Sequence, residues 1–165
     1  MPQSKKEGLK RHRNLDRTDR AILAALQDNG RISNVALAET VHLSPSPCLE
    51  RVKRLESAGY IEGYTARLSP DMLGYGKVAF IQVNLEKTTE ELFLEFKQQI
   101  MSSPFVAECH MVAGGYDYLL KVRFDDVDNY REVLESVVQF PGVSQTHTYI
   151  VIEQVKVFAD VPLGD

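Results

Sequence analysis

Two prolines in the run Ser44–Pro47 constrain the fold of this chain more than any other feature of its sequence. Proline lacks a backbone N–H and its φ is fixed near the helical value, so a helix accommodates it best in the first turn. Apolar residues follow at helical spacing: Cys48, Leu49, Val52 and Leu55. Gly59 is a suitable C-terminal stop. The sequence therefore predicts a helix that begins within the proline run and ends just before Gly59.

Two shorter helices are predicted upstream of this one. Asp16 is a suitable N-cap for the first, which ends at Asp28–Gly30, and Ser33 caps the second. His42 occupies the turn between the second and third helices and tolerates a positive φ there better than a β-branched residue would. The residues expected on the buried sides are Ile22, Leu23 and Leu26 in the first helix and Val35, Leu37, Ala38 and Val41 in the second.

The segment Tyr60–Leu68 is predicted to be extended chain with a turn at Gly63. Helix, short helix, tight turn, basic helix and extended wing together indicate a winged helix-turn-helix. In such a unit the recognition helix enters the major groove of DNA and its N-terminal side chains reach the base edges. The candidate DNA-contacting residues are Ser44, Ser46, Pro47, Glu50, Arg51, Lys53 and Arg54.

Arg51 and Arg54 are one helical turn apart and can face the same groove or backbone. A guanidinium group suits phosphate and guanine because its fork donates two parallel hydrogen bonds. The alternative is that both arginines are solvated helix surface and that Cys48 is simply a small core residue. The tight turn before the helix favours DNA for the arginines.

Charge is distributed unevenly along the chain. Residues 1–70 carry 12 Lys and Arg against 8 acidic residues, whereas residues 71–165 carry 7 against 15, for a net charge of −4 overall. A basic front half indicates a first domain that meets a polyanion. The basic arm at residues 1–13 would then add attraction to DNA that is independent of sequence and falls with salt. The alternative is a solvated, flexible, charged terminus.

The back half predicts strand, helix, strand, strand, helix, strand, which is a ferredoxin-like α+β arrangement. The expected strands are 77–86, 106–112, 117–124 and a long last strand 143–158. Thr88 with Glu91 has capping-box spacing at the start of the first helix, and Asp126 or its neighbour starts the second. Two helices cover one face of such a sheet, so the open face and the long last strand predict self-association.

Several classes of function are disfavoured. No apolar run approaches the roughly 20 residues of a membrane span, and the charged N-terminus does not resemble a signal peptide, so a cytoplasmic protein is expected. Cys48 and Cys109 have no CxxC pattern. Cys109 and His110 are neighbours in a strand and point to opposite faces, and although His147 could approach either, no third ligand is at hand. We therefore expect no catalytic residue, metal ion or cofactor.

The loop Gly114–Asp117 is a candidate site for a small molecule. Paired glycines permit positive φ and leave backbone N–H groups open to a carboxylate, and Asp117 can receive an ammonium group. Together these groups offer what an α-amino acid needs. The alternative is a plain hairpin turn with a polar residue at its edge.

Five segments together resemble the Lrp/AsnC (feast/famine) family of transcription regulators. They are Asn14–Asp19, Asn29–Asn34, Leu43–Val52, Gly63–Ala66 and Glu108–Lys121. The resemblance covers roughly residues 14–157, and the run Ser-Pro-Ser-Pro-Cys-Leu-Glu-Arg is its most specific part. Two positions depart from the family pattern: Gly115 stands where leucine-responsive members commonly have an acidic residue, and His42 where glycine is usual.

The resemblance implies a bacterial or archaeal winged-helix protein that binds double-stranded DNA and is joined to an amino-acid-binding, RAM-type regulatory domain. Such domains dimerise through their sheets and build larger oligomers, often octamers, with the free amino acid effector between dimers. Leucine is the implied effector, with methionine or another amino acid as the alternative. Carried over by position, the effector residues are Met111, Asp117, Val138, Tyr149, Ile150 and Val151, with Gly114 and Gly115 from the loop.

The expected organisation is a basic arm at 1–13, a winged helix-turn-helix at 14–67, a linker at 68–76, an effector and oligomerisation domain at 77–158 and a tail at 159–165. The expected function is transcription regulation in response to an amino acid, without catalysis. A ligand-independent architectural protein that compacts DNA is the main alternative. An enzyme of amino-acid metabolism built on the ferredoxin-like half is a further one.

Overall fold

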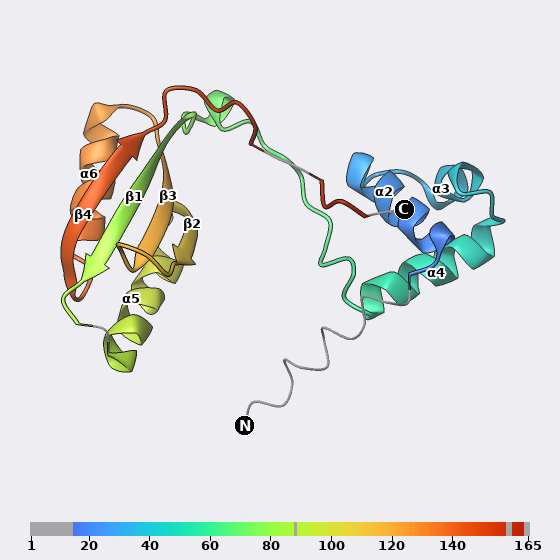
Figure 1. The fold of residues 1–165 in the computed structure, drawn as a ribbon. Coiled ribbons are helices and arrows are strands. Elements are labelled where there is room, and N and C mark those ends of the chain that lie inside the picture. The colour runs from blue at the N-terminus through green and yellow to red at the C-terminus, as the bar shows by residue number, and fades with distance from the viewer. Residues whose placement is uncertain (1–14, 88, 158–159, 164–165) are drawn as a thin grey trace. The chain divides into compact units, whose positions relative to one another are not determined.

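The structure, a computed structural model, describes residues 15–87, 89–157 and 160–163 (Figure 1). The basic arm expected at residues 1–13 lies outside them. The chain divides into two compact units. The described part of the first contains residues 15–67 together with 160–163, and the second runs from Leu68 to Val157.

Within its described residues, the first unit contains three helices: α2 (Arg17–Asp28), α3 (Asn34–Thr40) and α4 (Pro45–Ser57). Asp16 caps α2 in a reciprocal capping box with Asp19, and the Ser33 hydroxyl accepts a hydrogen bond from the Ala36 N–H over 3.2 Å. Ser44 is the N-cap residue of α4, with proline in the first turn as the sequence predicts. The three predicted helices and their starts are thus confirmed.

The core of this unit is built from all three helices. Its buried apolar residues are Ile22, Leu23, Leu37, Ala38, Val41, Cys48 and Leu55. Cys48 is fully buried, which confirms it as a small core residue. The expectation that Val35 is buried is wrong, because its side chain is 56% exposed. Val35 lies two residues before Leu37, about 200° around the helix, and so projects from the opposite side of α3.

The turn between α3 and α4 is intact although it lacks glycine. His42 has a φ of 56°, as expected for this position. The Leu43 N–H donates to the Ala38 carbonyl over 2.8 Å and so closes the end of α3. After α4, Gly59 adopts a φ of 77°, and residues 60–69 form no strand. The Tyr64 hydroxyl donates to the Glu56 carboxylate over 2.9 Å, which holds this wing segment against α4.

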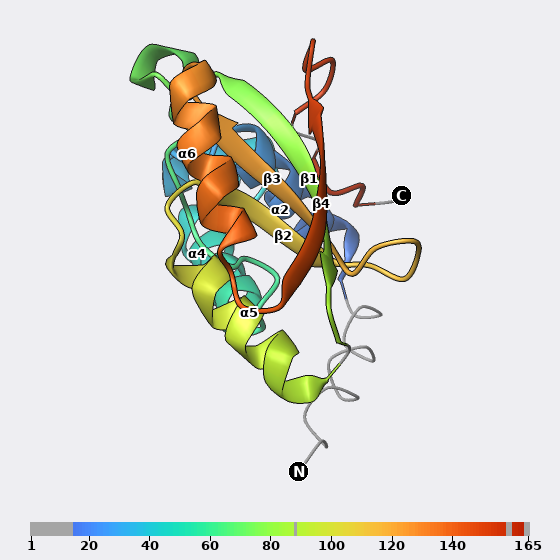
Figure 2. The same cartoon turned by 90° about the vertical axis from the view of Figure 1, so that its left-hand side faces the viewer.

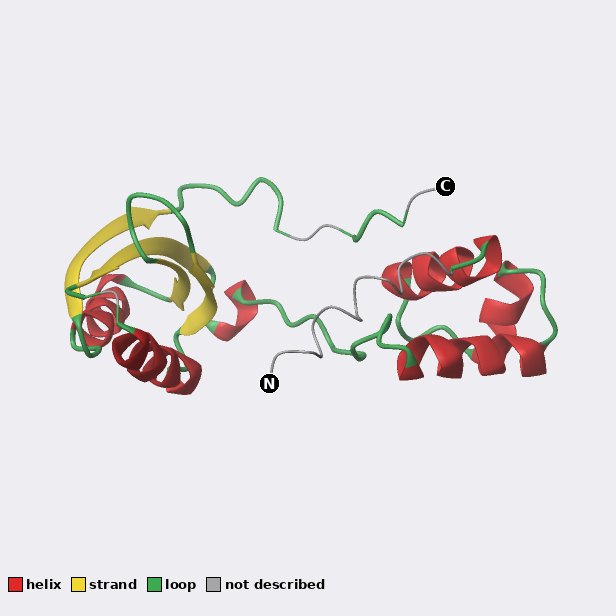
Figure 3. Ribbon diagram, turned by 60° about the horizontal axis from the view of Figure 1, so that its bottom comes forward, coloured by secondary structure: helices red, strands yellow, loops and turns green. Residues whose placement is uncertain are grey.

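The second unit is a four-stranded sheet with two helices. Its strands are β1 (Lys77–Leu85), β2 (Val106–Met111), β3 (Tyr118–Phe124) and β4 (Val143–Ile150), in the order β2-β3-β1-β4 with every neighbouring pair antiparallel. The helices α5 (Glu90–Ser102) and α6 (Val127–Val138) lie on one side of the sheet (Figures 2 and 3). A short 3-10 helix, Asp71–Leu73, precedes β1. The predicted α+β, ferredoxin-like order is confirmed.

Two details of this unit differ from the sequence prediction. The hydroxyl that accepts from the Leu92 N–H at the start of α5 belongs to Thr89, while Thr88 lies outside the described residues. The last strand ends at Ile150 instead of continuing to residue 158. Its partner β1 begins at Lys77, and the Val151 N–H already bonds to the Val78 carbonyl, so the chain beyond has no strand left to pair with.

The core of the second unit lies between the sheet and its helices. Ile81 and Val83 of β1 and Leu120 of β3 are fully buried in the same cluster as Phe96 of α5. The ring of Tyr118 packs against Phe96 with centroids 4.5 Å apart. Alternate residues of β1 therefore turn to the opposite, helix-free face, where they are only partly buried.

Candidate functional site

A cluster of charged residues joins α2 to α4. Arg51 contacts the Asp16 carboxylate over 2.6 Å and the Asp19 carboxylate over 2.8 Å, and Arg54 pairs with the same oxygen of Asp19. Asp19 is fully buried. The pKa of Asp16 lies below its usual range, first because its carboxylate accepts from the Asp19 N–H and then because of Arg51.

This cluster changes the interpretation of the two arginines. The guanidinium group of Arg51 turns toward α2, and its side chain is 32% exposed, whereas the side chain of Arg54 is 56% exposed. A buried carboxylate without a partner is costly, so two arginines that satisfy Asp19 hold the helices together. Sequence reasoning treated Asp16 only as a cap and did not use Asp19. The available signal was a pair of acids spaced three residues apart on α2 and a pair of arginines spaced three apart on α4.

The start of α4 presents the remaining predicted residues together. Ser44, Ser46, Pro47, Glu50 and Lys53 are all exposed along its first turns. The side-chain amide of Asn34 donates to the Pro45 carbonyl over 2.8 Å and so fixes α3 to this end of α4. The result is a rigid helix start with small and polar side chains, a shape that suits close approach to a nucleic-acid groove.

The loop between β2 and β3 is tied to β1 through Asp117. The backbone N–H of Asp117 donates to the Val83 carbonyl over 3.0 Å, and the carboxylate of Asp117 accepts from the Leu85 N–H over 2.8 Å. Gly114 and Gly115 are exposed, with open space where a Cβ would lie. The positive φ considered for these glycines is not adopted by either. The loop projects away from α5 and α6, beyond the open side of the sheet (Figure 2).

Register separates the predicted effector residues into two groups. Asp117 lies beside Val83 near the end of β1, whereas Ile150 pairs with Ala79 near its start. Four residues of strand span roughly 13 Å. The group on the Asp117 side includes Met111, the last residue of β2, and Val138, the last residue of α6, which are 53% and 51% exposed. The other group consists of Tyr149, Ile150 and Val151. One subunit therefore does not bring the two groups into one pocket.

The candidate thiol and histidines are dispersed. Cys109 packs against the core under the helices, and burial raises the pKa of its thiol. His110 is exposed and faces Glu108. His147 is on β4, at the opposite edge of the sheet from β2, so it does not approach either residue. Among the described residues, no three His, Cys, Asp or Glu side chains are placed to share a metal ion, and no helix is long and apolar enough to cross a membrane.

Family models match both units. Residues 15–62 match a winged helix-turn-helix DNA-binding domain, and residues 78–160 match the Lrp/AsnC ligand-binding domain. The leucine-responsive regulatory proteins of Escherichia coli K12 and Klebsiella pneumoniae are each 47% identical to this chain over 145 residues, which are 87% of this chain and 88% of theirs.

Solved structures give the same result. A transcriptional regulator of Neisseria meningitidis, solved as a complex with L-methionine, has a TM-score of 0.85 at 39% identity, covering 90% of this chain and 97% of that one. An AsnC-family regulator of Agrobacterium tumefaciens has a TM-score of 0.86 at 28% identity over the same shares. These matches are to transcription regulators and not to enzymes, as the sequence analysis expects.

Proposed function

The chain belongs to the Lrp/AsnC family of transcription regulators, and on that premise we propose that its effector is leucine or methionine, bound in a site that two subunits complete. It binds DNA through its winged helix-turn-helix and responds to an amino acid through the second unit. We also propose that it works in the cytoplasm, where it would meet the DNA that it regulates. The identity of the amino acid, the residues that bind it and the assembly are the proposal.

The observation that carries the proposal is the separation of the two groups of effector residues. An α-amino acid needs an acceptor for its ammonium group, donors for its carboxylate and an apolar surface for its side chain. Asp117 supplies the first, the backbone of Gly114 and Gly115 the second, and the exposed Met111 and Val138 part of the third. The exposed apolar Ile150 lies too far along the sheet to join them, so a second subunit must present it.

The open face of the sheet is the surface through which we propose that two subunits form a dimer. Phe80 on β1 lies opposite Tyr149 on β4, on the face that α5 and α6 leave uncovered, and Tyr149 is 54% exposed. Two such faces packed together would form a dimer. Dimers that meet near the loop 112–117 would then build the larger oligomer, with an octamer as the expected product.

On the DNA side, we assign base-edge and phosphate contacts to the exposed residues at the start of α4. These are Ser44, Ser46, Pro47, Glu50 and Lys53. The side chain of Arg54 is more than half exposed, so we infer that it reaches a phosphate while it is paired with Asp19. Arg51 instead positions α4 through α2.

The test is a thermal-shift series of the full chain with each amino acid at millimolar concentration. A ligand at 100 times its Kd stabilises the folded state by about 2.7 kcal/mol, which shifts the melting temperature measurably. We expect a shift confined to leucine, methionine and close analogues, together with a change in DNA affinity. Stabilisation by none of the amino acids, with DNA binding that tolerates any sequence, would instead support the architectural alternative.

A further inference from the structure

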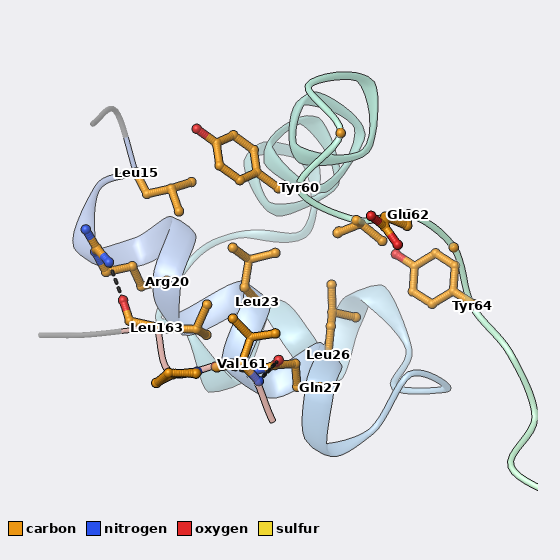
Figure 4. A pocket seen from close by; sticks show the side chains of 14 residues that line it. Leu15, Arg20, Leu23, Leu26, Gln27, Tyr60, Glu62, Tyr64, Val161 and Leu163 are labelled. Atoms are coloured by element: carbon orange, nitrogen blue, oxygen red, sulfur yellow. Dashed lines mark hydrogen bonds between the residues drawn. The ribbon is translucent and has the colours of Figure 1, made fainter. Parts of the chain in front are cut away.

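The C-terminal residues Asp160–Leu163 are packed on the DNA-binding unit. The Val161 N–H donates to the Gln27 side-chain carbonyl over 2.8 Å, and the Gln27 amide donates back to the Val161 carbonyl over 3.2 Å. The guanidinium group of Arg20 donates to the Leu163 carbonyl. Figure 4 shows these bonds from α2 to the tail. Residues 134 and 143 positions apart in the sequence are thus joined.

The contact is built like a peptide-binding site. Gln27 satisfies both backbone groups of one tail residue, as a neighbouring strand would. The Leu163 side chain packs against the core of the unit and is partly buried. Beside it lies a cavity of about 690 Å³, which the tail lines on one side and α2 and the wing segment on the others (Figure 4). Its apolar lining includes Leu15, Leu23, Leu26, Tyr60 and Ile61.

The tail is also the direct continuation of the effector unit. β4 ends at Ile150, and Tyr149, Ile150 and Val151 form one of the two proposed effector groups. Val161 is only ten positions after Val151 in the sequence. The chain therefore passes between the units twice, once after Arg67 and once after Val157. The second passage begins six residues after Val151, the last of these effector residues.

The two family matches do not include this contact. They end at residues 62 and 160, and the docked residues Val161–Leu163 follow. The family models therefore do not supply this contact.

We propose that the C-terminal tail is a second tether, which docks in the groove between α2 and the wing segment and transmits effector occupancy from the end of β4 to the DNA-binding unit. The inference rests on the proposed function for the identity of the effector. Coupling of this kind is reciprocal: if a bound amino acid weakens docking of the tail, an undocked tail strengthens binding of the amino acid by the same factor.

Docking is measured first, with tryptophan fluorescence. The chain contains no Trp, so the variant Leu163→Trp carries a single reporter that fits beside the cavity. We expect blue-shifted emission from the buried ring. Adding Gln27→Ala to this variant removes both hydrogen bonds to Val161 and should move the emission to the red. Identical emission from water-exposed rings in both proteins would overturn the docking.

Coupling is measured on the full chain by DNA titration with and without leucine or methionine. The coupling factor is the ratio of the DNA affinities measured with and without the amino acid. In allosteric proteins such factors are typically about 5- to 150-fold. In a protein that ends at Asp160, and in Gln27→Ala, we expect this factor to fall to roughly twofold or less while DNA binding without amino acid persists. The matched control is Gln98→Ala, an exposed glutamine of α5, which should keep the full factor.

The outcomes separate the two hypotheses. An unchanged factor in both tail variants overturns the coupling and leaves the proposed function intact. If neither amino acid alters DNA binding by the parent protein, the proposed function fails and the coupling fails with it. The fluorescence comparison needs no amino acid and decides the docking in either case.

Discussion

Arg51 on α4 donates to the fully buried carboxylate of Asp19 on α2 over 2.8 Å, and this ion pair joins the recognition helix to the helix behind it. Arg54 meets the same oxygen. The orientation of α4 therefore depends on the charge of the Asp19 carboxylate, which is buried. Substitutions in this cluster should act on stability first and on DNA binding only through it.

The variant Arg51→Ala tests this role. It leaves the Asp19 carboxylate with one arginine partner instead of two, beside the Asp16 N–H, and an incompletely satisfied buried polar group costs about 1–3 kcal/mol. We expect a loss of about 2 kcal/mol in the unfolding free energy, measured by urea denaturation followed by circular dichroism. DNA affinity should fall with it, while the oligomer size in light scattering stays the same.

The control for Arg51→Ala is Lys53→Ala, because Lys53 is exposed on the same helix. Its stability should match the parent. Its DNA affinity should fall, and the slope of log affinity against log salt should become shallower by about one. An Arg51→Ala protein as stable as the parent, with weakened DNA binding, would return Arg51 to the DNA interface.

Acid should weaken the same cluster. The folded-state pKa of Asp16 is lowered, first by the Asp19 N–H and then by Arg51. The unfolded chain has the ordinary aspartate pKa of about 3.9, so the stabilisation from Asp16 is fully present above that value. It is lost as pH falls through the lower folded-state pKa. Urea midpoints of the parent between about pH 6 and 2 should therefore drop more steeply than those of Asp16→Asn; parallel curves would contradict this.

A glycine after α6 should tolerate no side chain. Gly142 has a φ of 76°, and a Cβ there would lie 2.4 Å from Leu92 on α5. We expect Gly142→Ala to destabilise the second unit by about 1–3 kcal/mol, since both the backbone conformation and the packing oppose it. The matched control is Gly114→Ala, where a Cβ meets open space. Thermal unfolding of both variants measures the difference.

Much of the fold could be predicted from the sequence because its signals are local. Asp16, Ser33 and the proline run mark helix starts through contacts within three or four residues, and the structure has all three helices there. The limit of β4 could not be predicted in this way. Its own residues continue to favour a strand, but pairing stops where β1 begins at Lys77, which precedes Ile150 by 73 positions in the chain.

The candidate site shows the same division. The sequence indicates which residue types gather at the start of α4 and in the loop 112–117, and the structure exposes them there. It does not indicate that Arg51 is already paired with Asp19, because the partners lie 32 residues apart and the spacing of charges within each helix does not show which helices face each other. The docking of Val161 on Gln27 consists of hydrogen bonds between a side-chain amide and the backbone of a distant residue, and no hydrophobic pattern indicates such a contact.

The effector assignment is tested by Asp117, whose carboxylate has two separable roles. It accepts from the Leu85 N–H over 2.8 Å, which holds the loop to β1, and we propose that it also binds the ammonium group of the effector. Asp117→Asn keeps an oxygen for the Leu85 N–H and removes the charge. We expect unchanged thermal stability and unchanged DNA binding, with amino-acid affinity reduced at least tenfold, since a hydrogen bond to a charged group contributes about 1.5–3 kcal/mol. Asp117→Ala should lose both the affinity and part of the loop's stability. A calorimetric titration that finds parental affinity in Asp117→Asn would remove the carboxylate from the ammonium site and leave it a purely structural role.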